Sequence, residues 1–173
     1  HGEIIAETVL AMLLSHCRGL READLLRAEN PWPRKELAEK LKPLRGSRLT
    51  ILGLGNIGRW IAKLAKPFGV QVSGICTEPR PSPDFFEAGD EVLGIDSLDS
   101  ILPRTDHLVI ALPSGPATDG LIGARRLDLL PRHASLSNIG RGNSVDEKAL
   151  AGALESGKLA AAWLNTCLLY TSD

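Results

Sequence analysis

Apolar residues follow two alternating patterns along this chain, one helical and one typical of buried strands. The helical pattern opens the sequence, because Ile4, Ile5, Val9, Met12 and Leu13 fall on one face and predict a long helix. The next stretch, up to Gly46, is charged and interrupted by three prolines, which favours short helical pieces crossing the surface. The pattern therefore predicts an opening helix over 1–22 and a surface connection over 23–48.

From Leu49 onward, strand and helix patterns alternate. LTILG, the glycine turn LGNIG, the helical RWIAKLAKPFG and the apolar VQVSGIC form one strand–helix–strand unit. Further strands are predicted at DEVLGI, DHLVIALP, HASLSNIG and KLAAAWLN, with helices around 97–102, around 123–130 and in VDEKALAGALESG. Such alternation predicts an α/β fold, a Rossmann-type doubly wound parallel sheet over 49–166 with helices on both faces.

Composition excludes several classes of function. Twenty basic residues against twenty-one acidic residues give a net charge of −1, so no positive field attracts nucleic acid or an anionic membrane. The longest apolar stretch, Val9 to Leu14, is far shorter than the roughly 20 residues of a membrane span. Single, scattered cysteines at 17, 76 and 167 indicate reduced thiols in a cytoplasmic protein and no metal site.

Three glycines mark the most informative turn. Gly53, Gly55 and Gly58 form GxGxxG directly after a strand and directly before a helix, the context of a dinucleotide fingerprint. The first allows a tight turn, the second lets a pyrophosphate approach the backbone, and the third lets helix and strand pack closely. The amides of Asn56 and Ile57 would then face the phosphates at the positive end of the helix. The alternative is a turn that merely connects strand to helix.

The choice of dinucleotide stays open. An acidic residue at the end of the second strand normally binds the adenine ribose, but Cys76 occupies that position. Glu78 lies two residues later and could bind the ribose hydroxyls, whereas Arg80 could bind a 2′-phosphate. We expect NAD or NADP, with a slight preference for NAD.

Longer motifs resemble a known family. GLGNIGRWIAKLAKPFGVQVSG, DHLVIALPSGPATDGLIGARRLDLLP and LSNIGRGNSVDEKALAGALESGKLAAAWLN resemble, in order and spacing, the D-2-hydroxyacid dehydrogenases, and IAETVLAMLL resembles their domain-crossing helix. The resemblance implies an oxidoreductase that passes a hydride between a nicotinamide cofactor and a small 2-hydroxy or 2-oxo acid. It also implies a homodimer of the glyoxylate/hydroxypyruvate reductase or phosphoglycerate dehydrogenase type.

The resemblance assigns roles to individual residues. It makes Arg141 the anchor for the substrate's carboxylate, a task that suits a planar and permanently charged fork, with a surface ion pair as the alternative. It places Leu112, Pro113 and Thr118 near the adenosine, and Ile139 and Gly140 towards the nicotinamide. For Pro113 and Thr118, turn and helix-cap chemistry is an equal alternative.

The end of the chain departs from the family pattern. Asn165 stands where the family has an aspartate that touches the nicotinamide, and residues 167–173, CLLYTSD, read as a translated sequencing adapter. The resemblance implies a proton-transferring histidine and its glutamate downstream of Asn165, and none of the four histidines present is assigned that role. We therefore expect a fragment with an incomplete sheet that lacks its last strand, and one that is inactive by itself.

Other functions remain compatible with these motifs. Corepressors that sense the dinucleotide share the family's fold, so a binding module without turnover is one alternative. Formate and phosphite dehydrogenases share the cofactor domain and are another.

Overall fold

A computed structural model describes residues 2–27, 38, 41–78 and 80–164 of the chain. A single sheet organises this part, in the order β3-β2-β1-β4-β5-β6, and all neighbouring strands run parallel. The strands are β1 (Arg48–Leu52), β2 (Gln71–Cys76), β3 (Glu91–Gly94), β4 (His107–Ile110), β5 (Ser135–Asn138) and β6 (Ala161–Leu164). This arrangement confirms the doubly wound parallel fold.

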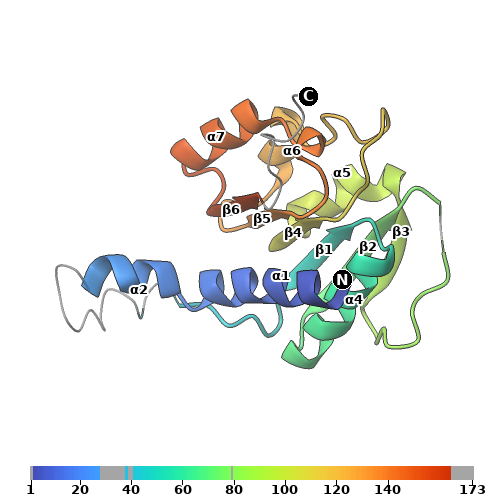
Figure 1. Ribbon diagram of the computed structural model, residues 1–173, viewed down its shortest axis with the longest axis horizontal. Helices are drawn as coiled ribbons and strands as arrows, with labels where there is room; N and C mark the ends of the chain where they lie inside the picture. Colours follow the sequence, from blue (N-terminus) through green and yellow to red (C-terminus); the bar gives the residue numbers. More distant parts are fainter. Residues whose placement is uncertain (1, 28–37, 39–40, 79, 165–173) are drawn as a thin grey trace.

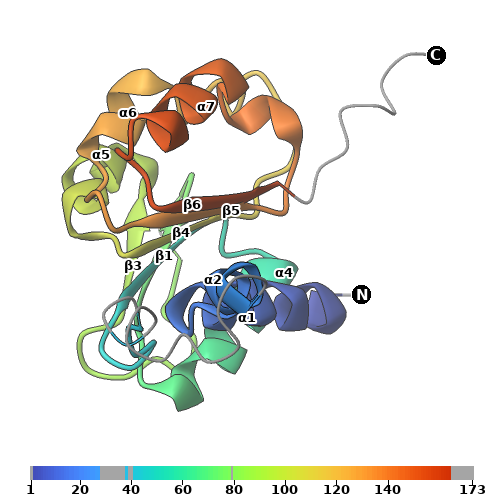
Figure 2. The ribbon, with the colours of Figure 1, turned by 90° about the vertical axis from the view of Figure 1, so that its left-hand side faces the viewer.

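Helices cover both faces of the sheet (Figures 1 and 2). On one face lie α1 (Gly2–Cys17) and α4 (Asn56–Ala65), with α2 (Leu20–Arg27) leading away from the sheet. The other face is covered by α5 (Leu98–Ile101), α6 (Ala124–Leu129) and α7 (Glu147–Glu155). Short 3-10 turns complete the structure: η1 (Lys66–Phe68), η2 (Ile95–Ser97), η3 (Leu102–Arg104) and η4 (Gly142–Ser144).

The central strands are apolar on both sides because each side meets a helical layer. In β1, Leu49 and Ile51 belong to the core beneath α1 and α4, whereas Leu52 belongs to the core beneath α5, α6 and α7. The neighbouring β4 alternates in the same way, with Val109 in the first core and Ile110 in the second. This double burial explains why the strands read as continuous apolar runs in the sequence.

The opening helix is shorter than predicted. It ends at Cys17, and Gly19 adopts a left-handed φ of 56° while its N–H donates to the carbonyl of His16 at 3.1 Å. Glycine adopts this conformation without steric cost, so the chain turns here and α2 starts as a separate helix at Leu20. Within the described ranges, no helix is long and apolar enough to cross a membrane.

Candidate dinucleotide-binding site

The candidate site lies where the strand order reverses direction. From β1 the chain proceeds outward to β2 and β3, then returns to β4 on the other side of β1 and continues to β5 and β6. Ligands of open α/β sheets bind beyond the carboxyl ends of the strands at this reversal point. The loops that follow β1, β4 and β5 meet at this edge, and they contain most of the predicted site residues.

Close packing explains two of the three glycines in the turn. Gly53 has a φ of 94°, its N–H donates to the carbonyl of Ile75 at 2.9 Å, and a Cβ there would lie 2.7 Å from the carbonyl oxygen of Ala111. A Cβ on Gly58 would overlap the carbonyl oxygen of Gly53 and lie 3.2 Å from Ile51. These two positions therefore exclude any larger residue for structural reasons.

Gly55 differs from both, because a Cβ there would meet nothing within 4 Å. Its backbone is extended and precedes the first residue of α4, and no side chain caps this helix. The N–H groups of the first turn, including those of Asn56 and Ile57, are thus left for an external acceptor at the positive end of the helix. This open, uncapped cradle fits a dinucleotide pyrophosphate.

The loop after β5 holds Arg141 at the same edge. Asn138 is fully buried and closes the loop, because its Nδ2 donates to the carbonyl of Arg141 at 2.8 Å and its Oδ1 accepts from the N–H of Gly140 at 3.1 Å. Gly140 lies against the backbone of Leu112, where a Cβ would overlap the Leu112 carbonyl oxygen. The side chain of Arg141 is exposed, and its Nη1 donates to the carbonyl of Gly140 at 3.1 Å.

The loop after β4 shows the turn chemistry that was one alternative for Pro113 and Thr118. The Thr118 hydroxyl lies 2.9 Å from the carbonyl oxygens of both Pro113 and Gly115, and the Thr118 N–H donates to Gly115 at 2.8 Å. Thr118 therefore stabilises its own turn. Leu112 is buried, 9% exposed, and its backbone forms the contact with the β5 loop.

The loops after β4 and β5 are joined to each other. Ile122 and Val145 form an isolated parallel bridge, and the N–H of Gly120 donates to the carbonyl of Asn143 at 2.7 Å. The Asn143 side chain also donates to Asp119. These bonds fix one side of the site as a unit.

The end of β2 carries no carboxylate. Cys76 is only 7% exposed and belongs to the core, while Glu78 and Arg80 are exposed beyond it. Two residue types that could select between a ribose diol and a 2′-phosphate are therefore available to solvent. Asn165, the predicted contact to the nicotinamide, lies outside the described residues.

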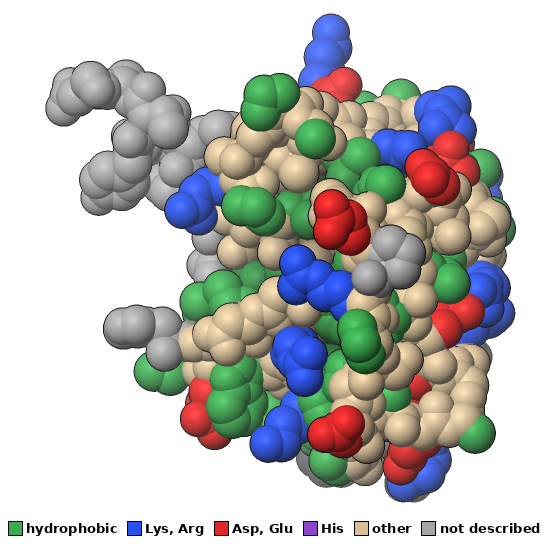
Figure 3. All heavy atoms as spheres, turned by 90° about the vertical axis from the view of Figure 1, so that its right-hand side faces the viewer, with side chains coloured by type: hydrophobic (Ala, Val, Ile, Leu, Met, Phe, Trp, Pro, Cys, Tyr) green, Lys and Arg blue, Asp and Glu red, His purple; other side chains and the backbone are tan. Residues whose placement is uncertain are grey.

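The three described histidines gather at the opposite edge of the sheet. His107 begins β4, His133 precedes β5, and His16 lies at the end of α1, so all three are at the amino ends of the strands. The face seen in Figure 3 shows interspersed acidic and basic side chains and no described histidine. The sequence could have predicted that His107 and His133 lie close together, because they stand at the beginnings of two predicted parallel strands. Nothing in the sequence indicated that His16 would join them. Among the described residues, no three His, Cys, Asp or Glu side chains converge as a metal site.

Comparison with known proteins identifies the family. Residues 10–167 match the model of the D-isomer specific 2-hydroxyacid dehydrogenase, NAD binding domain. D-3-phosphoglycerate dehydrogenase of Methanocaldococcus jannaschii is 32% identical over 161 residues, which cover 93% of this chain and 30% of that protein.

Solved structures agree with this match. Phosphoglycerate dehydrogenase from Lactobacillus plantarum has a TM-score of 0.86 and 31% identity, covering 100% of this chain and 54% of that one. A D-isomer specific 2-hydroxyacid dehydrogenase from Xanthobacter autotrophicus, solved with NADPH, has a TM-score of 0.83 and 30% identity. The match covers 99% of this chain and 68% of that one. The chain spans less than a third of the length of the M. jannaschii relative. It belongs to the D-isomer specific 2-hydroxyacid dehydrogenase family and is an NAD-binding domain of that family.

Proposed function

We propose that this chain binds NAD or NADP at the carboxyl edge of its sheet, with the pyrophosphate against Gly55 and the first turn of α4. The single observation that carries the proposal is the contrast among the three glycines. Gly53 and Gly58 are packed against backbone, whereas Gly55 faces open space beside uncapped N–H groups. If the turn only connected strand to helix, a residue with a side chain would fit at position 55 as well as glycine.

In the complete enzyme, we propose that Arg141 binds the carboxylate of a small 2-hydroxy or 2-oxo acid. The buried Asn138 holds the loop, and the exposed guanidinium stands at the same edge as the glycine turn. A planar guanidinium can bind a carboxylate through two parallel hydrogen bonds. The bound nicotinamide would supply or accept the hydride.

No histidine of the described part of the chain lies at this edge to transfer the proton. The histidines at 16, 107 and 133 all lie at the amino edge, across the sheet from the glycine turn. We therefore propose that residues 2–164 bind cofactor and substrate carboxylate without turnover. The acid–base pair would come from a part of the protein outside these residues.

The finer properties of the whole protein are also proposals. We propose a slight preference for NAD, based on the exposed Glu78 beyond β2, and a titration with both dinucleotides tests it. We further propose a homodimer and a cytoplasmic location, the latter consistent with the unpaired thiols of Cys17 and Cys76.

The test of the site is an Arg141→Ala variant, with Arg125→Ala as its control. Arg125 is equally a surface arginine, but it pairs with Asp99 at 2.7 Å, away from the glycine turn. In the full-length enzyme, loss of a charged hydrogen-bonded pair should lower kcat/KM about tenfold to hundredfold for Arg141→Ala only. The cofactor Kd should stay nearly unchanged in both variants. Normal kinetics in Arg141→Ala would remove this residue from the site.

A further inference from the structure

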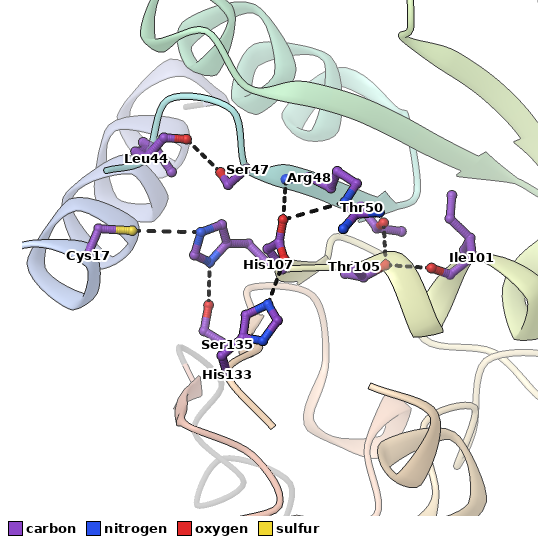
Figure 4. A network of polar contacts seen from close by, with 11 residues as sticks. Cys17, Leu44, Ser47, Arg48, Thr50, Ile101, Thr105, His107, His133 and Ser135 are labelled. Carbon is purple, nitrogen blue, oxygen red and sulfur yellow. Dashed lines mark hydrogen bonds and ion pairs between the residues drawn. The ribbon is translucent and has the colours of Figure 1, made fainter. Parts of the chain in front are cut away.

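A polar cluster at the amino edge of the sheet connects α1 to the starts of two strands (Figure 4). It contains Cys17 from α1, His107 from the start of β4 and His133 from the turn before β5. Asp106, which directly precedes β4, and His16 of α1 also belong to it. A cavity of about 620 Å³ lies beside it.

His107 is the centre of this cluster and is almost completely buried, with 5% of its surface exposed. Its Nε2 lies 3.7 Å from the Sγ of Cys17, and its Nδ1 lies 2.8 Å from the hydroxyl of Ser135, which is fully buried. A neutral imidazole has one donor and one acceptor, so these two neutral partners satisfy it. A protonated ring would instead place a charge between them without a carboxylate in contact.

The charged neighbours do not offset such a proton. Asp106 is the nearby acid, but its Oδ1 accepts from His133 at 2.7 Å and its Oδ2 accepts from the N–H of Arg48 at 2.7 Å. Asp106 still raises the pKa of His107, whereas His16, on α1, His133, before β5, and Lys42, before β1, lower it. The pKa of His107 is lowered to about 4, with burial as the largest cause and the charge of His16 as the second.

Glu22, on α2, acts on His16 rather than on His107. Burial lowers the pKa of His16, and Lys42 lowers this pKa further. Glu22 and a hydrogen bond to the backbone of His133 raise it. Burial likewise raises the pKa of the Cys17 thiol, so this partner of His107 stays neutral. The contact between α1 and β4 is therefore an uncharged one.

The other end of α1 reaches the glycine turn. At Gly2, a Cβ would lie 3.0 Å from the Nδ2 of Asn56 and 3.0 Å from Trp60, so the helix touches the first turns of α4. Sixteen helical residues span about 24 Å, and buried side chains of α1 and α4 share one core between the two ends. The helix α1 therefore connects the Cys17 contact at one edge of the sheet with Asn56 at the other.

We propose that His107 is a positioning residue for the dinucleotide site: in its neutral form it seats the end of α1, and α1 supports the first turn of α4. Protonation of His107 unseats the last turn of α1 and loosens the cofactor cradle. The proposal rests on dinucleotide binding at this turn.

Hydrogen exchange on the full 173-residue chain tests the seating directly. For a histidine with a pKa of 6.5 in water and about 4 when buried, the ratio of unseated to seated helix rises about tenfold between pH 7.5 and 5.5. Protection factors of the last turn of α1 should fall by at least that amount in the wild type and by clearly less in His107→Gln, in which the lowered pKa of His16 still makes the seating of α1 depend on pH. The matched control, His133→Gln, should respond like the wild type. An equal pH response in His107→Gln would overturn the proposal.

Added NAD tests the coupling across the helix. Because coupling between sites is reciprocal, NAD should raise the protection of the last turn of α1 as well as that of the glycine turn. Protection confined to the glycine turn would overturn the coupling. If NAD did not bind at either pH, the proposed function would fail, and the comparison without NAD would still decide the role of His107.

If His107→Gln does not fold, an NMR titration of the wild-type imidazole replaces it. Titration of His107 below pH 5 is expected. A midpoint near the ordinary value of 6.5 would overturn the proposal.

Discussion

Replacing Gly58 by alanine should separate the packing role of the glycine turn from its binding role. The added methyl group would overlap the carbonyl oxygen of Gly53, a backbone atom that cannot rotate away, and would crowd Ile51 at 3.2 Å. Overpacking of this kind costs about 3 kcal/mol at the upper end of its usual range. Alanine returns about 1 kcal/mol of helix propensity within α4, so the net loss of stability should be about 2 kcal/mol.

Gly55→Ala is the matched control, because a Cβ there meets nothing within 4 Å. Its φ of −74° and ψ of −160° suit alanine, but Gly55 is the N-cap of α4, where glycine is preferred over alanine. This cost offsets the gain in chain entropy, so the stability should change by less than about 1 kcal/mol. Its methyl group would nevertheless occupy the cradle and should weaken NAD binding at least about tenfold, or about 1.4 kcal/mol. Urea unfolding and a fluorescence titration with NADH measure the two effects. A Gly58→Ala variant as stable as the wild type, or a Gly55→Ala variant with normal affinity, would refute the reasoning.

Three further predictions follow from buried polar groups. Asn138→Ala removes both bonds that close the loop after β5 and should cost about 2 kcal/mol in urea unfolding; an unchanged midpoint would contradict the described loop. The folded protein favours the neutral form of His107, so the contribution of this residue to the free energy of unfolding is complete above pH 6.5. It should decline by about 3 kcal/mol as the pH falls towards 4, and His107→Gln should lack this loss in unfolding curves at pH 7.5 and 4.5. Lys66→Met leaves Asp90, whose side chain is 1% exposed, without its cation at 2.8 Å and should cost about 3 kcal/mol, whereas Glu87→Gln, at a side chain 73% exposed, should cost less than about 1 kcal/mol; equal effects would contradict the burial.

The strands and the glycine turn could be predicted because their signals are local. Each central strand is apolar on both faces, and the turn's glycines stand at fixed offsets between a strand and a helix. The close packing at Gly58 also followed from its spacing, whereas the role of Gly55 at a pyrophosphate stays a prediction. The structure adds the atoms that enforce the packing at Gly53 and Gly58, namely the carbonyl groups of Ala111 and Gly53.

Contacts between distant segments were beyond sequence reasoning. Cys17 and His107 are 90 residues apart, and no periodicity indicates which strand the end of an opening helix will meet. The break at Gly19 was missed because the apolar pattern continues through it, and a single glycine does not reveal its φ. By contrast, the turn chemistry of Thr118 is local; the sequence offered it as one of two alternatives, and the carbonyl groups of Pro113 and Gly115 show that it occurs.

The bridge between Ile122 and Val145 has an evolutionary consequence. Because this bridge and the Gly120–Asn143 bond join the loops after β4 and β5, an insertion or deletion in one loop would shift the register of the other. Length changes should therefore be tolerated before Gly120, where residues 116 and 117 are exposed, and selected against between Gly120 and Ile122. Divergence of the β5 loop in related sequences should then proceed by point substitution around Arg141, with length variation confined to the outer part of the β4 loop.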